Sequence, residues 1–296
     1  MGGKRLGART LVLQNRPAIT GHACAVGKME GEGPLRDSFD AVEQDARCGM
    51  KSWEQAESAL VKKAFRLAAE KAGVRENNPQ LIFAGDLLNQ CIGTGYGLRN
   101  TGVPHLGLYG ACSTMAESLL LAAVLVDGGY ADTAAAVTSS HFCTAERQFR
   151  MPLDYGGQRP PTAQWTVTGS GAAIVRNTSG RHPRVTHVTP GVIVDAGIKD
   201  ANNMGAAMAP AAYDTIRCHL KDRNLSPRDF DLIVTGDLGS VGGGILVDWF
   251  RKDGTDISAV YADCGMLIFD PKRQDVHAGG SGCGCSASVK APLKPS

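Results

Sequence analysis

The chain has 296 residues, with 37 glycines, 37 alanines and only 6% aromatic residues. This length suffices for about two domains with a buried core, and 43% hydrophobic content with scattered charges excludes a disordered chain. The net charge of +2 and the lack of a basic tract argue against nucleic acid as a partner. The apolar run 119–126 is shorter than the roughly 18 residues of a membrane span, so no direct span is expected.

The nine cysteines are an odd number scattered along a chain that needs no disulfides, which indicates a reducing, cytoplasmic compartment. No apolar signal-peptide core follows the basic residues near the N-terminus. The one close pair, Cys283 and Cys285, has no second pair and no histidines at zinc spacing, so no metal site is expected.

The first clear element is a helix from Glu54 to Lys71, whose apolar residues recur at helical spacing. Gly73 is placed to end it, because glycine readily adopts the left-handed backbone of a helix terminus. A buried strand from Leu81 to Ala84 follows and runs into the sequence GDL, which contains Asp86.

A small-residue loop with Cys112 precedes a strongly apolar helix from Thr114 to Val126. Thr114 and Glu117 have the spacing of a capping box. A helix that is apolar on nearly all sides is expected to be buried between two sheets. Cys112 would then lie at the helix mouth, where free amide groups and the helix dipole favour the thiolate. The alternative is an inert buried cysteine, the usual fate of a free thiol.

The second half repeats this order with a helix from Ala211 to Leu220, a terminator at Asn224 and a strand from Leu232 to Thr235. The two terminators and the two strands are each 151 positions apart, and LIFAGDL matches LIVTGDL at five of seven positions. This indicates two related halves, which we divide into 1–180 and 181–296. Asp237, the counterpart of Asp86, is expected to shape a turn.

Alternating helices and apolar strands predict an α/β fold with largely parallel sheets. The loop 278–287 is a second small-residue segment of the same kind as the Cys112 loop. If the two loops meet across a pseudo-twofold axis, they form one pocket lined by helix N-termini, which suits an anion.

These features together resemble the thiolase and ketosynthase superfamily, and more closely the stage V sporulation protein AD family of endospore-forming bacteria. The shared strings are AGDLLNQ (84–90), GACST (110–114), TSSH (138–141), TAERQFR (144–150), YGGQ (155–158), TVTGSGA (166–172), MAPAA (208–212), TGDL (235–238) and AGGSGC (278–283). They cover most of residues 10–288 in the expected order.

The resemblance implies a thiolase-like fold: two pseudo-symmetric βα halves in layered α-β-α-β-α packing. It implies non-catalytic binding of dipicolinic acid, alone or as its calcium complex, for uptake into the developing spore, with no other cofactor. It further implies other proteins of the uptake system as partners, peripheral association with the spore inner membrane through them, and the capacity to form a homodimer.

The candidate ligand-binding residues fall in the shared strings, and Cys112 aligns with the nucleophile of the superfamily. The others are Asp86, Ser139, Ser140, His141, Arg147 and Ser281. An alternative function is an acyltransferase or Claisen-condensing enzyme that uses Cys112, which would require a base and oxyanion donors. His277 lies a few residues before the position where thiolases carry a histidine, and we expect it to be a surface residue. A structural subunit with a vestigial pocket is a third possibility.

Only residues 286–296 follow Cys285, whereas the first half continues beyond Cys112 through a helix and further strands. Pro292 and Pro295 cannot continue a buried helix or a central strand. Relative to the family, the second half is therefore expected to be truncated, without its last helix and two strands, and to expose sheet edges and apolar surface.

Overall fold

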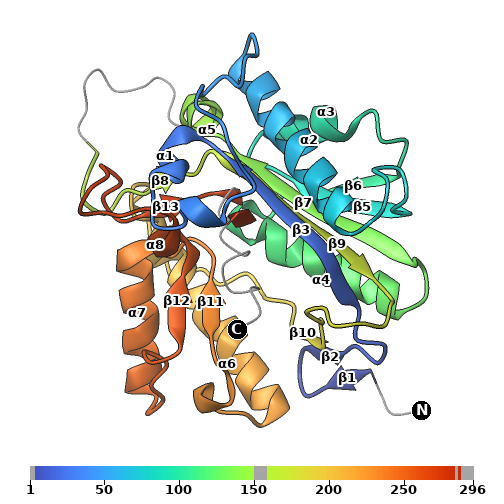
Figure 1. Cartoon of the computed structure of the whole chain (residues 1–296). Helices are drawn as coiled ribbons and strands as arrows, with labels where there is room; N and C mark the ends of the chain where they lie inside the picture. Colours follow the sequence, from blue (N-terminus) through green and yellow to red (C-terminus); the bar gives the residue numbers. More distant parts are fainter. Residues whose placement is uncertain (1–3, 150–158, 284–285, 288–296) are drawn as a thin grey trace.

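The computed structural model describes residues 4–149, 159–283 and 286–287 (Figure 1). Its centre is a six-stranded mixed sheet with the strand order β4-β3-β9-β7-β5-β6. These strands are β3 (Ala18–Val26), β4 (Ala41–Val42), β5 (Leu81–Gly85), β6 (His105–Gly107), β7 (Thr133–Ser140) and β9 (Gly169–Arg176). Strand β5 pairs in parallel with β6 and β7, and β3 with β4, whereas β9 is antiparallel to β3 and β7.

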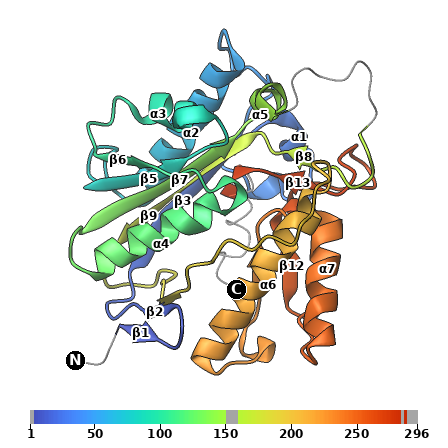
Figure 2. The same cartoon turned by 180° about the vertical axis from the view of Figure 1, so that it is seen from behind.

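Helices cover both faces of this sheet (Figures 1 and 2). Helices α2 (Trp53–Lys71) and α3 (Ile92–Leu98) lie on one face, and α4 (Thr114–Asp127) lies on the other. The small residues allow close packing: a Cβ at Gly21 of β3 would lie 2.3 Å from the Ala68 carbonyl oxygen of α2. All eight residues of the alanine-rich strand β7 are buried, as expected for a central strand covered on both faces.

The second half contains a two-stranded parallel sheet of β11 (Ile233–Thr235) and β12 (Tyr261–Asp263). Its helices are α6 (Met204–Arg223), α7 (Gly239–Lys252) and α8 (Cys264–Ile268), and α6 packs on α7 (Figure 1). The expected helix terminators are confirmed, because Gly73 and Asn224 both adopt left-handed backbone with φ of 66° and 52°. The repeated order of helix, terminator and strand is therefore present in both halves.

Short strands join the two halves. Strand β10 (His187–Val188) pairs with β2 (Thr10–Val12), and β13 (Gly280–Ser281) pairs with β8 (Trp165–Thr166). The predicted boundary near residue 180 lies in the connection between β9 and β10. The remaining short elements are β1 (Arg5–Leu6), α1 (Lys28–Gly31), α5 (Phe142–Phe149) and the 3-10 turns Arg36–Ser38, Asn89–Cys91, Ala111–Ser113 and Pro227–Asp229.

Two expectations for α4 were wrong. The helix is buried on the side of Ala122, Ala123 and Val126 that faces the sheet, but Leu121 and Val124 are partly exposed. The capping box does not form, because Thr114 lies inside the first turn and its hydroxyl donates to the Ala111 carbonyl at 2.7 Å. Within the described ranges, no helix combines the length and hydropathy needed to cross a bilayer.

Three features named from the sequence lie outside the described residues. They are the string 155–158, Cys285 and the proline-containing segment 288–296.

Candidate functional site

Cys112 lies in the 3-10 turn Ala111–Ser113 that leads directly into α4. Ala111 has left-handed backbone with φ of 47°, a costly conformation for a residue with a Cβ, and such strain is often found at functional sites. The turn is held by Thr114, whose hydroxyl donates to Ala111 O at 2.7 Å and accepts from Gly110 N at 3.2 Å. Cys112 is thus presented on a fixed turn.

The second small-residue loop meets this turn, as the pseudo-symmetry predicts. The Cys283 thiol lies 3.0 Å from Ala111 O, and the Thr138 hydroxyl of β7 donates to Cys283 O at 3.2 Å. Gly282 of this loop is close enough to Cys112 to lower the pKa of its thiol. The two halves therefore converge on Cys112.

Asp237 was expected to shape a turn, and it lies in the turn between β11 and α7 with left-handed backbone, at a φ of 65°. Asp237 is fully buried after β11, and its carboxyl is one of the groups that raise the pKa of the Cys112 thiol. The turn is held by Asp263, whose carboxylate accepts from Leu238 N and Gly239 N, each at 2.9 Å. Sequence reasoning missed Asp237 as a site residue, although its position as the repeat of Asp86 was visible.

Asp86, the counterpart in the first half, does shape its loop. It is fully buried at the end of β5 and accepts from Leu88 N at 2.8 Å, from Thr94 N at 2.7 Å and from the Thr94 hydroxyl at 2.8 Å. Burial raises the pKa of the Asp86 carboxyl. The described contacts of Asp86 are therefore those of a residue that fixes the loop 86–94.

The electrostatics of Cys112 differ from the expectation of a thiolate at a helix mouth. Burial raises the pKa of the Cys112 thiol well above its usual value, and the Asp237 carboxylate and the neighbouring Cys283 add to this rise. The amide of Gly282 acts in the opposite direction but does not outweigh them. This direction is opposite to the one that a helix mouth favours, and desolvation is its largest cause.

A second buried acid, Glu57 of α2, lies beneath the loops and was not found from the sequence. The hydroxyls of Ser139 and Thr144 each donate to its carboxyl at 2.9 Å. Burial and the nearby Asp86 carboxyl raise the pKa of Glu57 to about 8. The sequence did contain an indication of this buried acid, because Glu57 interrupts the apolar stripe on the inward side of the helix 54–71.

Ser140 and Ser281 lie with the converging loops. The Ser140 hydroxyl donates to Val167 O at 2.7 Å, and its oxygen would be 2.9 Å from a Cβ on Gly282. Ser281 is buried in β13, where it pairs with Thr166 of β8. The structure thus brings Cys112, Ser140 and the loop 280–283 together.

His141 and Arg147 make other contacts. The His141 Nδ1 atom accepts from Cys143 N at 3.1 Å, so its Nε2–H donates to Ala46 O at 2.8 Å. Burial lowers the pKa of His141, which favours this neutral tautomer and occupies both ring nitrogens. Arg147 is half-exposed and pairs with Glu54 of α2.

His277 contacts Asp275, with 3.3 Å between Nε2 and Oδ1. In the described part of the chain, no three histidine, cysteine or carboxylate side chains are arranged to hold a metal ion. A groove of about 1210 Å³ between α2 and α3 includes Glu54 and Tyr96 and lies apart from Cys112.

Comparisons with known proteins show the family and the fold of this chain. A sequence profile of the stage V sporulation protein AD family matches residues 7–293. The chain is also 46% identical over 286 residues to stage V sporulation protein AD of Bacillus subtilis (strain 168), covering 97% of this chain and 84% of that protein. The chain belongs to the stage V sporulation protein AD family. It is therefore a sporulation protein, as the shared strings indicated.

Solved structures show that the fold is thiolase-like. The 3-oxoacyl-(acyl carrier protein) synthase III of Xanthomonas oryzae superimposes with a TM-score of 0.62 at 15% identity, covering 95% of this chain and 91% of that one. OleA of Xanthomonas campestris with bound cerulenin gives 0.61 at 15% identity, covering 95% and 89%. The synthase III of Aquifex aeolicus gives 0.58 at 11% identity, covering 94% and 90%. The predicted fold class is confirmed.

Proposed function

We propose that this family member binds dipicolinic acid, as its calcium complex, without catalysis and for uptake into the developing spore. The observation that carries the non-catalytic part is the surroundings of Cys112: burial, the Asp237 carboxyl and Cys283 all raise the pKa of its thiol. Acyl transfer needs a thiolate and a base that accepts its proton, and a carboxylate that stabilises the thiol opposes the first requirement. The ligand itself is inferred from family membership and the resemblance of the shared strings.

Charge favours the calcium complex over the free ligand. Dipicolinate is a planar dianion, and the converging loops place the Asp237 carboxyl near Cys112. Two like charges 4 Å apart repel by about 4 kcal/mol at an effective dielectric constant of 20. Calcium cancels the two charges of dipicolinate, so the complex avoids this repulsion. In this proposal calcium arrives as part of the ligand and is not a resident cofactor of the protein.

The converging loops offer donors to such a ligand. Ser140 and Ser281 would contribute hydroxyls, and backbone amides at the mouth of α4 would contribute N–H groups. To bind the ligand, Arg147 would have to break its ion pair with Glu54 and pair with a carboxylate of the ligand.

Titration calorimetry tests the proposed ligand. We expect saturable binding of calcium dipicolinate, weaker binding of dipicolinate alone, and no binding of pyridine-3,5-dicarboxylate, which has the same charge but cannot chelate calcium in the same way. Cys112→Ala should weaken binding, and Arg147→Ala should do so only if the ligand reaches α5. Absence of binding by the folded wild-type chain to both forms of dipicolinate would refute the proposal.

Substitution of Asp237 tests whether its carboxylate repels the free ligand. Asp237→Asn should increase the affinity for free dipicolinate about ten-fold relative to the calcium complex, because it removes a repelling carboxylate. Asp248→Asn, on the exposed side of α7, is the matched control and should leave the ratio of the two affinities unchanged.

The second candidate function is acyl transfer through Cys112, which its position on a strained turn before α4 favours. Incubation with acyl-coenzyme A followed by peptide mass spectrometry decides this, because the covalent mechanism requires an acylated Cys112 peptide. Retained sporulation in pocket variants would instead favour a purely structural subunit.

We further propose that partners of the dipicolinate uptake system hold the chain at the spore inner membrane. A peripheral location would follow from those protein contacts. We also propose a homodimer, and the exposed edge strand β6 supports it because its outward backbone groups have no strand beside them in the described sheet.

A further inference from the structure

The turn 236–239 and the loop 278–283 of the second half both approach Cys112. A Cβ on Gly236 would lie 3.3 Å from the Cys112 carbonyl oxygen. The Cys283 thiol lies 3.0 Å from the carbonyl oxygen of the residue before Cys112. The shape of the proposed ligand pocket therefore depends on how this turn and this loop are held relative to each other.

One side chain of the first half, Gln164, joins the turn to the loop. Gln164 comes directly before β8 and is 4% exposed. Its Nε2 atom donates to the Asp237 carbonyl oxygen at 2.7 Å and to the Gly280 carbonyl oxygen at 2.8 Å. Both partners are acceptors only, so a single orientation of the amide satisfies them. One NH2 group thus binds a residue of the turn and a residue of the loop at the same time.

We propose that Gln164 is a positioning residue, which fixes the turn 236–239 against the loop 278–283 and so shapes the pocket beside Cys112. It acts through two backbone carbonyl groups and not on the ligand. The inference deepens the binding function proposed above and rests on it for the identity of the ligand. It assigns to a residue of the first half the arrangement of two segments of the second half.

The packing around Gln164 requires a close approach of the turn and the loop. Gly239 has a φ of 63°, and a Cβ there would lie 2.2 Å from the Ala278 carbonyl oxygen and 2.9 Å from Gln164 Nε2. The Ser240 amide donates to the same Ala278 oxygen at 2.9 Å. The Gln164 Oε1 atom is buried and has no hydrogen-bond donor among the described residues. Since an unsatisfied buried acceptor is unfavourable, the two donated bonds are what hold the amide in this orientation.

Gln274 provides a matched control for substitutions of Gln164. Its Nε2 atom also donates to a backbone carbonyl of a distant segment, that of Met29 in α1, at 2.7 Å. This contact involves neither the turn nor the loop. Gln164→Glu and Gln274→Glu are therefore the same chemical change, and only the first places a carboxyl group against both segments.

Hydrogen exchange of the full chain, measured by peptide mass spectrometry against wild type at the same pH, tests the joint. Gln164→Met keeps the approximate size of the side chain but removes both donated bonds, so exchange in residues 236–239 and 278–283 should become about ten-fold faster. Gln164→Glu should loosen both segments more at pH 8.5 than at pH 5.5. A carboxylate repels the two carbonyl oxygens, whereas a protonated carboxyl can donate to one of them. Gln274→Glu should leave both segments at the wild-type rate.

The affinity for calcium dipicolinate links the joint to the pocket. Titration calorimetry of Gln164→Met should show about ten-fold weaker binding than wild type, and Gln274→Glu should show no change. Unchanged exchange in the Gln164 variants, faster exchange in only one of the two segments, or faster exchange with unchanged affinity would overturn the proposal. If Gln164→Met does not fold by circular dichroism, the pH response of Gln164→Glu decides. Loosened segments in a chain whose wild type binds no calcium dipicolinate would refute the proposed ligand and not the joint.

Discussion

Glu57 shows how a single residue can make folding depend on pH. Its carboxyl is enclosed by α2, Ser139 and Thr144, and its pKa is raised from 4.5 to about 8 by burial and by Asp86. Between these values the folded chain holds a proton that the unfolded chain has released. The free energy of unfolding therefore falls as the pH rises from 4.5 to 8, and Glu30, with a pKa raised to about 7 by burial, adds to the same slope.

Glu57→Gln should flatten this slope. Glutamine is neutral at every pH and can keep both hydroxyl contacts, so we expect the variant to be more stable than the wild type at pH 8 by about 1 to 3 kcal/mol. At pH 4.5 the two chains should be nearly equal. Urea unfolding at several pH values measures the difference. Glu70→Gln, on the exposed side of α2, is the control, and a parallel slope in Glu57→Gln and wild type would contradict the prediction.

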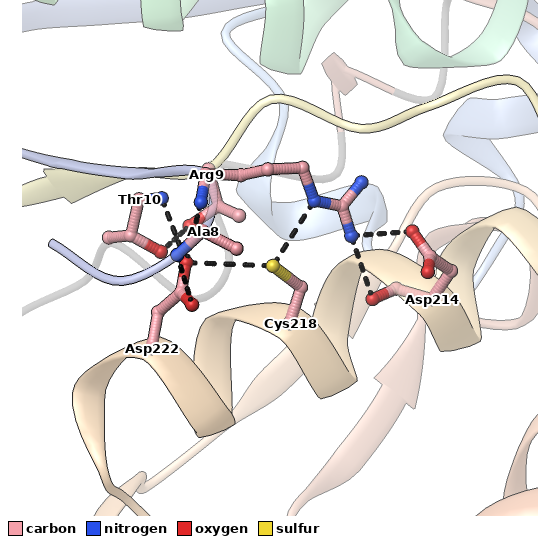
Figure 3. Close-up of polar contacts among 7 residues, drawn as sticks. Ala8, Arg9, Thr10, Asp214, Cys218 and Asp222 are labelled. Atoms are coloured by element: carbon pink, nitrogen blue, oxygen red, sulfur yellow. Dashed lines mark hydrogen bonds and ion pairs between the residues drawn. The ribbon is translucent and has the colours of Figure 1, made fainter. Parts of the chain in front are cut away.

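At the scale of the element, one carboxylate ties the N-terminal hairpin of β1 and β2 to α6 (Figure 3). Asp222 accepts from the backbone amides of Ala8 at 2.8 Å and of Arg9 and Thr10 at 2.9 Å. Gly7 permits this approach, because it has a φ of 59° and a Cβ there would lie 2.2 Å from the Asp222 carboxylate. The Arg9 side chain reaches Asp214 on the same helix at 2.6 Å.

Asp222→Asn should loosen the hairpin. The three amides hold the pKa of the Asp222 carboxyl well below its usual range, so the contact is complete at pH 7 and is lost only as the pH falls far below 4. At pH 7 we expect hydrogen exchange in residues 8–12 to become about ten-fold faster, with little change in the central sheet. Asp214→Asn removes only the side-chain pair with Arg9 and should have a smaller effect. Equal exchange in both variants would contradict the prediction.

The elements differ in how far the sequence could predict them. Helix α2 was expected at 54–71 and lies at 53–71, because apolar periodicity and a glycine terminator act locally. Helix α6 was expected from Ala211 but begins at Met204, since the segment before it lacks a clear apolar stripe. The approach of Gly236 to Cys112, where a Cβ would lie 3.3 Å from the Cys112 carbonyl oxygen, could not be predicted, because it joins residues 124 positions apart in different halves.

At the scale of the molecule, the pseudo-symmetry explains why one small region collects the unusual chemistry. Equivalent turns follow β5 and β11, and each delivers a buried aspartate near the meeting point of the loops. The two aspartates differ in their roles: Asp86 accepts hydrogen bonds from its own loop, whereas Asp237 raises the pKa of Cys112 in the other half. The duplication was visible in the sequence, whereas this division of roles depends on packing between the halves.

The edge strand β6 links the fold to assembly. Ile82 N donates to Pro104 O at 2.9 Å and Leu108 N donates to Ala84 O at 2.8 Å. Because residues alternate along a parallel ladder, His105 and Gly107 direct their backbone groups away from β5. Leu106 is also 45% exposed on this edge. Such an edge is self-complementary when two copies meet antiparallel about a twofold axis.

Gly107→Pro should therefore convert a dimer to a monomer. Proline removes an outward N–H group without removing a hydrogen bond to β5, so the central sheet should remain intact. Sedimentation equilibrium would measure the change, with an expected rise of at least ten-fold in the dissociation constant because pairing at the edge is lost. Ile193→Asp removes a fully exposed apolar side chain that lies outside every described strand and is the control. A wild-type chain that remains monomeric at high concentration, or a Gly107→Pro chain that dimerises as well as wild type, would exclude pairing through β6.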